Sequence, residues 1–391
     1  MEIAAVEVHV AELVLREALA TGAGAHARRP VVLVRVVSDQ GVGWGECVAL
    51  AEPTYSEEDA KGAVAALLDH LGPRVVAAPG SSEAPDAVAA AEAALEAMAP
   101  VRGHRMAKAA IEMAVLDAGL RAEGRSLATA LGASRARVAA GATVGLQAGT
   151  ADLVAAARRA IEAGYRRLKC KVVPGPSAAQ VAAVRRELPE LEVAVDANGT
   201  YRLDDPDHLA SLHLLDALGL VALEQPLDPD DLLGLARLAG ELDTLVLLDE
   251  AVRTPGQLEA AFALGAGDGL VVKPGPCGGV LTAARLARRC GALGWSCALG
   301  GMLETGLGRA ASLAVAALPA FDLPGDLGGS DRYFAHDLTE PHVAEAGELA
   351  VPSAPGVGRR PSRDALASLG ARRVGVVTAP TRPGQGAPAG S

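Results

Sequence analysis

Residues 167–198 read RLKCKVVPGPSAAQVAAVRRELPELEVAVDAN, and this stretch decides the fold class. A short strand-like run at 167–172 is followed by an amphipathic helical pattern at 177–187 and by a second apolar run at 191–195. Such an order predicts two parallel strands joined by a helix, because parallel neighbours need a long crossover connection.

The same alternation continues on both sides of this stretch, with a period of roughly 25 residues. Further helical patterns occupy 150–163 and 279–292, and further strands are expected at 137–144, 221–223, 245–248, 269–272, 296–299 and, weakly, near Phe321. Eight strands with intervening helices predict a (β/α)8-type barrel. An open doubly wound sheet is the alternative, but no Gly-x-Gly-x-x-Gly follows the first strand.

The regions outside this alternation predict a second, α+β unit. Residues 1–130 carry strand patterns at 3–10, 31–34 and 42–48 and helical patterns at 56–71, 82–98 and 106–123, with a long loop expected at 12–30. We therefore divide the chain into an α+β domain (1–130), the barrel (131–322), a segment that returns to the first domain (323–360) and a flexible tail (361–391).

Composition excludes several functional classes. The chain has 391 residues, half of them apolar, and a net charge of −11, which argues against nucleic acids and anionic lipid surfaces as partners. No apolar run reaches the roughly 18 residues of a membrane helix, and no signal peptide precedes the first strand. Five cysteines without a Cys-x-x-Cys pair fit a reducing cytoplasm, so we expect a cytoplasmic enzyme without disulfides or structural zinc.

Three acids follow three consecutive predicted strands. Asp196, Glu224 and Asp249 stand at strand ends, where barrel enzymes carry their catalytic groups. Each could instead be the N-cap of the next helix. Three together repel one another unless a cation joins them, and an all-oxygen ligand set favours Mg²⁺, or Mn²⁺, over zinc.

Lysine is rare here, since only five of the 36 basic residues are lysines, and three of those five lie at strand ends. Lys169 and Lys171 share one face of a strand, so their repulsion is expected to lower at least one pKa and to make a lysine base feasible. Lys273 follows a strand across the barrel mouth. This set suits removal of a proton next to a carboxylate; a Schiff-base aldolase would not need the three acids.

Weaker patterns suggest substrate contacts. Asn198, the only asparagine, lies on the same face as Asp196, and Tyr55 could close the mouth from the first domain; a turn and a packed core residue are their alternatives. The loop Gly300 to Gly306, with Gly301 and Met302, could bind an anion through backbone N–H groups. We add Thr143, at the end of the first barrel strand, to the candidate substrate contacts.

These residues resemble the enolase superfamily, and within it the muconate-lactonising group that includes o-succinylbenzoate synthases and N-succinylamino acid racemases. The stretches that carry the resemblance are Trp44 to Val48, Lys169-Cys170-Lys171, Asp196-Ala197-Asn198, Glu224-Gln225-Pro226, Asp249-Glu250, Gly300 to Arg309 and Asp326 to Glu340. The resemblance covers about residues 1–355. It implies that both chain ends form a capping domain over the barrel.

The resemblance also implies a role for each site residue. Mg²⁺ would bind Asp196, Glu224 and Asp249; Lys171 would be the base, tuned by Lys169. Lys273 would stabilise an enediolate in a synthase, or exchange roles with Lys171 in a racemase. The substrate would be a small carboxylate, and a homo-oligomer is expected because such enzymes commonly assemble symmetrically.

One departure from the family pattern favours the synthase. Family members with both activities often read Lys-x-x-Arg at the sixth strand, whereas Pro276 stands here in place of the arginine. Without that guanidinium, Lys273 is expected to stay protonated. Our leading expectation is therefore an o-succinylbenzoate synthase of menaquinone biosynthesis, a lyase. The alternatives are an N-acylamino acid racemase, another muconate-cycloisomerase-like enzyme and a metal-binding barrel without catalysis.

Overall fold

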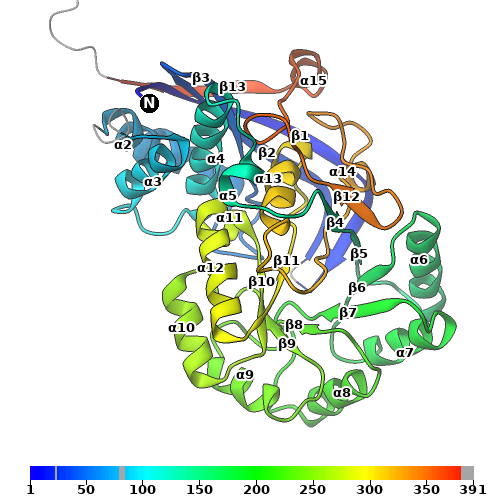
Figure 1. Cartoon of the computed structure of the whole chain (residues 1–391). Helices are drawn as coiled ribbons and strands as arrows, with labels where there is room; N and C mark the ends of the chain where they lie inside the picture. Colours follow the sequence, from blue (N-terminus) through cyan, green and yellow to red (C-terminus); the bar gives the residue numbers. More distant parts are fainter. Residues whose placement is uncertain (23, 79–83, 380–391) are drawn as a thin grey trace, which may run out of the picture.

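The structure, a computed structural model, describes residues 1–22, 24–78 and 84–379 and contains a barrel and a capping domain (Figure 1). The barrel strands form one parallel sheet in sequence order: β5 (Gly141–Val144), β6 (Arg167–Lys171), β7 (Glu192–Asp196), β8 (Leu223–Glu224), β9 (Val246–Leu248), β10 (Gly269–Val272) and β11 (Ser296–Leu299). The predicted barrel with a capping domain is confirmed, and the open doubly wound alternative is wrong.

Helices cover the outside of this sheet. They are α6 (Thr150–Glu162), α7 (Ser177–Glu187), α8 (Pro206–Asp216), α9 (Leu232–Ala239), α10 (Pro255–Leu264), α11 (Pro274–Cys277), α12 (Val280–Leu293) and α13 (Gly306–Ala316). Alternate strand residues point inward, where Ala222, Leu247, Val271 and Ala298 pack together as a small inner core. This packing fills the barrel interior and leaves the strand ends for polar groups.

The expected eighth strand is absent from the part of the chain that the structure describes. An irregular segment, 323–327, occupies its place and donates backbone hydrogen bonds from Leu323 and Asp326 to β11, and Leu327 accepts one from Gly141 of β5. Pro324 lacks a backbone donor, and a Cβ on Gly325 would collide with the carbonyl oxygen of Leu299. The local sequence therefore prevents a regular strand, although the hydrogen bonds of this segment still connect β11 to β5 and close the barrel.

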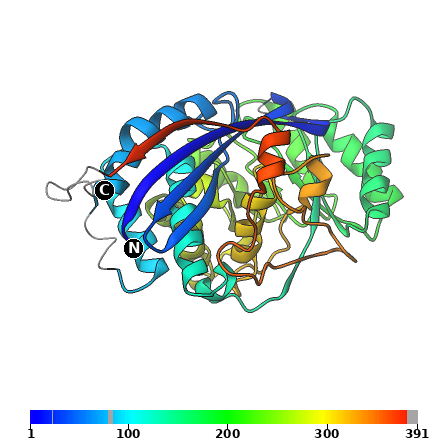
Figure 2. The same cartoon turned by 90° about the horizontal axis from the view of Figure 1, so that it is seen from above.

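The capping sheet is antiparallel, in the order β13-β1-β2-β3. Its strands are β1 (Ile3–Thr21), β2 (Gly24–Ser38), β3 (Gly41–Cys47) and β13 (Arg372–Thr378). Figure 2 shows β13, in red, beside β1, in blue. Two expectations are therefore wrong. Residues 12–21 and 24–30 belong to the paired strands β1 and β2 rather than to a long loop, and residues 363–368 and 372–378 form α15 (Arg363–Ser368) and β13 rather than a flexible tail.

Helices and short elements complete the capping domain. They are α1 (Ala60–Ala66), a π-helical turn η1 (Leu67–Leu71), α2 (Gly72–Ala77), α3 (Ala87–Met98), α4 (Arg105–Ala122), α5 (Leu127–Leu131) and α14 (Ser330–Tyr333). The expected first barrel strand, 137–144, is divided: β5 joins the barrel sheet, whereas β4 (Arg137–Ala139) pairs with β12 (Glu348–Ala350) as a separate ribbon. Helix α4 lies directly on β3, since a Cβ on Gly43 or Gly45 would collide with its backbone. Residues 380–391, the rest of the expected tail, lie outside the described residues, as do 82 and 83 of the expected helix 82–98.

Buried acids join the capping domain to the barrel. The Glu112 carboxylate of α4 accepts hydrogen bonds from the backbone N–H groups of Val280 (2.6 Å) and Leu281 (3.0 Å), the first residues of α12. A carboxylate at a helix N-terminus satisfies donors that have no partner inside the helix. This contact fixes the cap over the barrel beside the loop that follows β10.

Candidate active site

Strand register places the predicted catalytic groups side by side at the carboxyl end of the barrel. Lys171 pairs with Asp196 across β6 and β7, and Asp196 pairs with Glu224 across β7 and β8. Asp249 and Lys273 directly follow β9 and β10. Cys170 points away from the mouth and is fully buried, as the alternation of strand side chains requires.

Lys169 lies at the bottom of the site among three carboxylates. Its Nζ is 2.7 Å from Glu224 Oε2, 2.8 Å from Asp326 Oδ2 and 3.3 Å from Asp196 Oδ2. Burial lowers the pKa of Lys169, but attraction to Asp326, Glu224 and Asp196 outweighs it and raises the pKa well above its ordinary value. The expected lowering by a neighbouring lysine is therefore wrong for Lys169, because carboxylates surround it.

Lys171 stands higher in the mouth and lines the open pocket. Its Nζ donates to Asp196 Oδ2 at 2.5 Å and to Asn198 Oδ1 at 2.8 Å, and Asn198 Nδ2 donates in turn to Glu250 Oε1 at 3.0 Å. Asn198 has a left-handed backbone, with φ of 45°, which asparagine tolerates better than most residues. Asn198 thus serves a tight turn and also orients the Lys171 amine.

Lys273 meets a group from the capping domain. Its Nζ lies 2.5 Å from Asp249 Oδ2, donates to the Tyr55 hydroxyl at 3.1 Å and sits 4.8 Å from the centroid of the Tyr55 ring. The same hydroxyl donates to Asp249 at 3.0 Å. Burial lowers the pKa of Lys273, but Asp249 and the other nearby acids raise it well above its ordinary value. Lys273 is therefore held as a cation.

Acids outnumber lysines in this site. Five carboxylates (Asp196, Glu224, Asp249, Glu250 and Asp326) meet three ammonium groups, which leaves a formal charge of −2 when all are ionised. Burial, together with a neighbouring carboxylate, raises the pKa of Glu224 and of Glu250 to about 8. One oxygen of each, Glu224 Oε1 and Glu250 Oε2, has no hydrogen-bond partner among the described residues.

These observations fit a divalent cation. Across residues 1–22, 24–78 and 84–379, no three His, Cys, Asp or Glu side chains form a ready-made ligand group, since lysine amines contact the acids. An ion of charge +2 would balance the formal charge of −2, and Glu224 Oε1, which has no hydrogen-bond partner within these ranges, could be one of its ligands. Hard oxygen donors of this kind suit Mg²⁺ or Mn²⁺.

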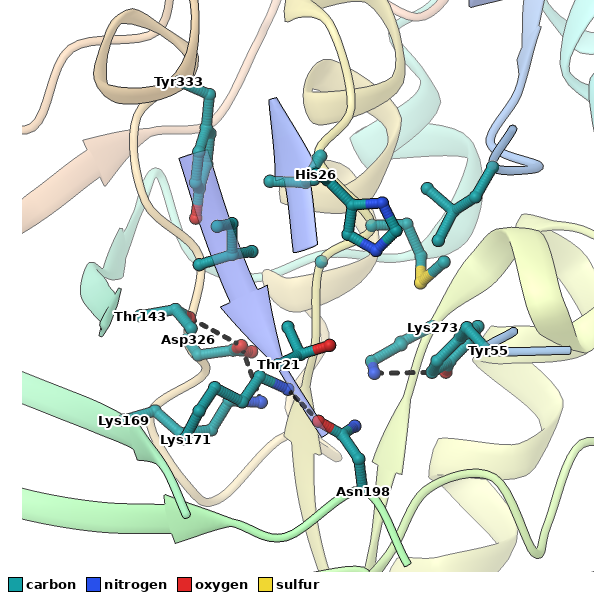
Figure 3. A pocket seen from close by; sticks show the side chains of 15 residues that line it. Thr21, His26, Tyr55, Thr143, Lys169, Lys171, Asn198, Lys273, Asp326 and Tyr333 are labelled. Atoms are coloured by element: carbon teal, nitrogen blue, oxygen red, sulfur yellow. Dashed lines mark hydrogen bonds and ion pairs between the residues drawn. The ribbon is translucent and has the colours of Figure 1, made fainter. Parts of the chain in front are cut away.

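The predicted substrate contacts surround one pocket of about 640 Å³ above the lysines (Figure 3). Its lining includes all five of them, Tyr55, Thr143, Asn198, Gly301 and Met302, together with the three lysines. The pocket is also lined by Leu19, Thr21, His26, Leu50, Leu303, Asp326 and Tyr333. The resemblance implies a role in substrate choice for the segment 16–29, which contains the first three, whereas the other four were not named as site residues. Asp326 had a usable signal, because it follows the weak eighth strand run.

Glu46 of the capping domain holds the loop that forms one wall of the pocket. Its carboxylate accepts hydrogen bonds from the Thr305 backbone (3.1 Å), the Thr305 hydroxyl (2.6 Å) and the Gly308 backbone (3.0 Å). Arg29 pairs with it at 2.8 Å, and both side chains are completely buried. The Gly301 to Leu303 wall therefore depends on a charge from β3.

The cysteines near the barrel loops are packing residues, as the sequence indicates. Cys277 and Cys297 are buried, and all five cysteines are free thiols. Burial raises the pKa of the Cys277 thiol to about 12, so it does not form a nucleophilic thiolate near neutral pH. The chemistry of the site comes from lysines and carboxylates.

Comparison with known families identifies both parts of the chain. Residues 5–132 match the family model described as mandelate racemase / muconate lactonizing enzyme, N-terminal domain, and residues 152–365 match the enolase C-terminal domain-like model. Together the two matches cover most of the chain, including the three predicted metal ligands and the three site lysines, whereas Thr143 lies between them.

Curated relatives carry two activities in their names. An N-succinylamino acid racemase from Amycolatopsis sp. is 41% identical to this chain. The aligned region covers 94% of this chain and 97% of the racemase. An o-succinylbenzoate synthase from Geobacillus stearothermophilus is 37% identical, with 89% and 90% of the two chains covered. A solved structure from Alicyclobacillus acidocaldarius, titled a probable mandelate racemase, is 38% identical with a TM-score of 0.85, over 96% of this chain and 97% of that one.

Proposed function

This chain belongs to the mandelate racemase / muconate lactonizing enzyme family of the enolase superfamily, and we propose that it dehydrates its substrate to o-succinylbenzoate. Enzymes of this family typically depend on a divalent metal ion. We assign Mg²⁺ to Asp196, Glu224 and Asp249, where it would supply positive charge to a substrate carboxylate that becomes an enediolate.

Lys171 is the base in this proposal. Its neutral amine takes the proton next to the carboxylate, and the C–H electron pair enters the enediolate. The resulting ammonium then gives its proton to the departing hydroxyl, so that water leaves and the ring becomes aromatic. Asp196 and Asn198, which bind the Lys171 amine, orient it toward the pocket.

Lys273 is assigned to electrostatic stabilisation of the enediolate. The observation that carries this assignment is its surroundings, since Asp249, Glu224 and the face of the Tyr55 ring all favour the charged amine. Pro276 introduces no second cation that would favour loss of that proton. A fixed cation opposite one base supports a one-base reaction such as the synthase reaction.

The absorbance of 2-succinyl-6-hydroxy-2,4-cyclohexadiene-1-carboxylate tests this function. We expect the signal to fall in the presence of Mg²⁺, to persist in EDTA and to persist with Lys171→Ala. Lys61→Ala, at an exposed lysine of α1, is the matched control and should remain active. A folded wild type that binds Mg²⁺ and leaves the substrate unchanged would refute the synthase assignment.

Racemisation of N-succinylamino acids is the second candidate. The 41% identity to the Amycolatopsis racemase favours it, and Lys171 and Lys273 line the same pocket. It requires Lys273 to give up and regain a proton. Fast racemisation that Lys273→Ala abolishes would establish this activity and show that Pro276 does not prevent it.

The setting of the enzyme completes the proposal. The described part of the chain contains no helix that is long and apolar enough to cross a membrane. We propose that the enzyme acts on a small carboxylate in the cytoplasm as a homo-oligomer. Size-exclusion chromatography with light scattering would give the number of subunits.

A further inference from the structure

A second cavity, open to solvent, adjoins the catalytic pocket. We call it the side chamber. It shares Leu19, Thr143 and Tyr333 with the catalytic pocket, so the two cavities are neighbours across these three side chains. In Figure 3, Thr143 and Tyr333 lie on one side of the pocket and Lys273 and Tyr55 on the other. The rest of the side chamber is lined by Arg16, Glu17, Ala18, Val144, Gly145, Gln147, Ala156, Arg159 and Arg332.

The side chamber has a strong excess of positive charge. Three guanidinium groups line it, those of Arg16, Arg159 and Arg332, against the single carboxylate of Glu17. Among the described residues, none of the three arginines has a carboxylate oxygen within 4.0 Å. Guanidinium groups that face a cavity without a counterion attract anions, because low-dielectric walls focus their field.

Neutral groups orient two of these arginines. Arg332 donates to the Thr143 carbonyl oxygen at 3.2 Å, and its guanidinium carbon lies 5.5 Å from the Tyr165 ring centroid. Arg16 donates through Nε to the carbonyl oxygen of Asp331 at 2.8 Å. Carbonyl oxygens and a ring face fix the direction of these guanidinium groups, and Asp331, which does not line the chamber, is an acid that interacts electrostatically with both.

Arg159 is the arginine with free donors. The Arg159 side chain, exposed on α6, lines the side chamber and makes no hydrogen bond or ion pair with another residue in the described part of the chain. Its neighbour Arg158 on the same helix behaves differently, since it pairs with Glu187 at 2.9 Å outside the chamber. Arg158, which is in an ion pair, and Arg159, whose side chain has no partner among the described residues, are therefore a matched pair for comparison by mutation.

We propose that the side chamber binds a second carboxylate, on the arm of the substrate remote from the reacting carbon. The Arg159 guanidinium binds this carboxylate through a bidentate pair of hydrogen bonds, and Arg16 and Arg332 add positive electrostatic potential. This inference rests on the proposed function, which places the first carboxylate at the metal and lysines. It makes Arg159 a residue that selects substrates with an anionic arm over equally long neutral ones.

The test compares two ligands that differ only in that charge. We would measure calorimetrically the binding of o-succinylbenzoate and of its side-chain carboxamide to the full chain with Mg²⁺. Wild type should prefer the dicarboxylate about tenfold or more, the size expected for a charge-assisted contact. Arg159→Gln should lose most of this preference with carboxamide binding unchanged, and Arg158→Gln should retain it.

Two results would overturn the inference. One is that Arg159→Gln lowers the affinity for both ligands equally, which would indicate general damage to the site. The other is a wild type that binds the two ligands equally or binds neither. Turnover of the cyclohexadiene substrate is measured separately, so an active wild type without charge preference refutes the side chamber alone. An inactive wild type that still prefers the dicarboxylate refutes the dehydration alone.

Discussion

Strand β6 of the barrel and strand β1 of the capping sheet both line the catalytic pocket, and they hold their side chains there differently. β6 has a parallel neighbour on each side, and its Lys169 is almost completely buried. The pairing of β1 with β2 is interrupted between Val14 and Leu19 and resumes in a new register at Leu19 to Thr21, the end of β1 that lines the pocket. The barrel thus holds the reacting groups on an uninterrupted parallel ladder, and the cap forms its wall with a strand whose pairing is interrupted.

Removal of the barrel base gives the largest expected effect. Lys171→Ala should lower kcat by about 10³-fold or more, because a positioned base contributes about 10² to 10⁴ and its ammonium also serves the leaving group. Steady-state kinetics measures the loss, and the thermal midpoint should change little. A residual rate within tenfold of wild type would show that the barrel does not carry the chemistry alone.

Removal of the Glu46 carboxylate of the capping domain should lower the free energy of unfolding more than it lowers the catalytic rate. Glu46→Gln leaves Arg29 buried without its counterion, so we expect the free energy of unfolding to fall by about 3 kcal/mol. Urea denaturation measures this change. The double variant Arg29→Met/Glu46→Gln should recover part of the loss. An unchanged midpoint in Glu46→Gln would mean that β3 does not hold the Gly301 wall.

His342 gives the seam between cap and barrel a dependence on pH. Burial, aided by Arg359, lowers the pKa of His342 to about 4 from the usual 6.5, and its Nε2 lies 3.0 Å from the Gly306 carbonyl oxygen. The folded state therefore binds fewer protons than the unfolded state below pH 6.5. Stability should fall by about 2 kcal/mol as pH drops from 6.5 to 4.

Denaturation at several pH values checks this prediction. His342→Gln keeps a donor for Gly306 and should flatten the stability profile in that window. His213→Gln, at an exposed position of α8, should leave the profile unchanged. If His342→Gln loses as much stability as wild type between pH 6.5 and 4, another group is responsible.

The smallest predicted effect concerns the contact that joins the two regions at the site. Tyr55→Phe removes the hydroxyl that bonds Lys273 and Asp249 but keeps the ring beneath the ammonium. We expect kcat/KM to fall about tenfold, as for the loss of a hydrogen bond to charged groups. A decrease in kcat/KM as large as that of Lys171→Ala would indicate that Tyr55 of the capping domain takes part in the reaction directly.

The same contrast explains what the sequence could predict. Period-2 and period-3.6 patterns locate β6 to β11, and strand alternation then places Lys169, Lys171 and Asp196 in one mouth. The eighth strand run near Phe321 is weak and the segment 323–327 is irregular, so Asp326 was not assigned to the site although it follows this run and contacts Lys169.

In the cap, distant pairing overrides local preference. Arg28, Arg29 and Pro30 interrupt the apolar alternation and suggest a loop, yet pairing with β1 makes this stretch part of β2. The side chamber was equally hidden, because Arg16, Arg159 and Arg332 come from three separate segments. Their convergence depends on tertiary structure.

The position of β13 also has a consequence for biosynthesis. One edge of the first strand, at Ala5 to Val10, pairs with residues 372–378. On the ribosome, that edge stays open while more than three hundred residues of cap helices and barrel are added, and the sheet can close only after β13 has been made. An uncovered strand edge invites pairing with other chains. Nascent chains halted before β13 should therefore be the species that aggregates or recruits chaperones.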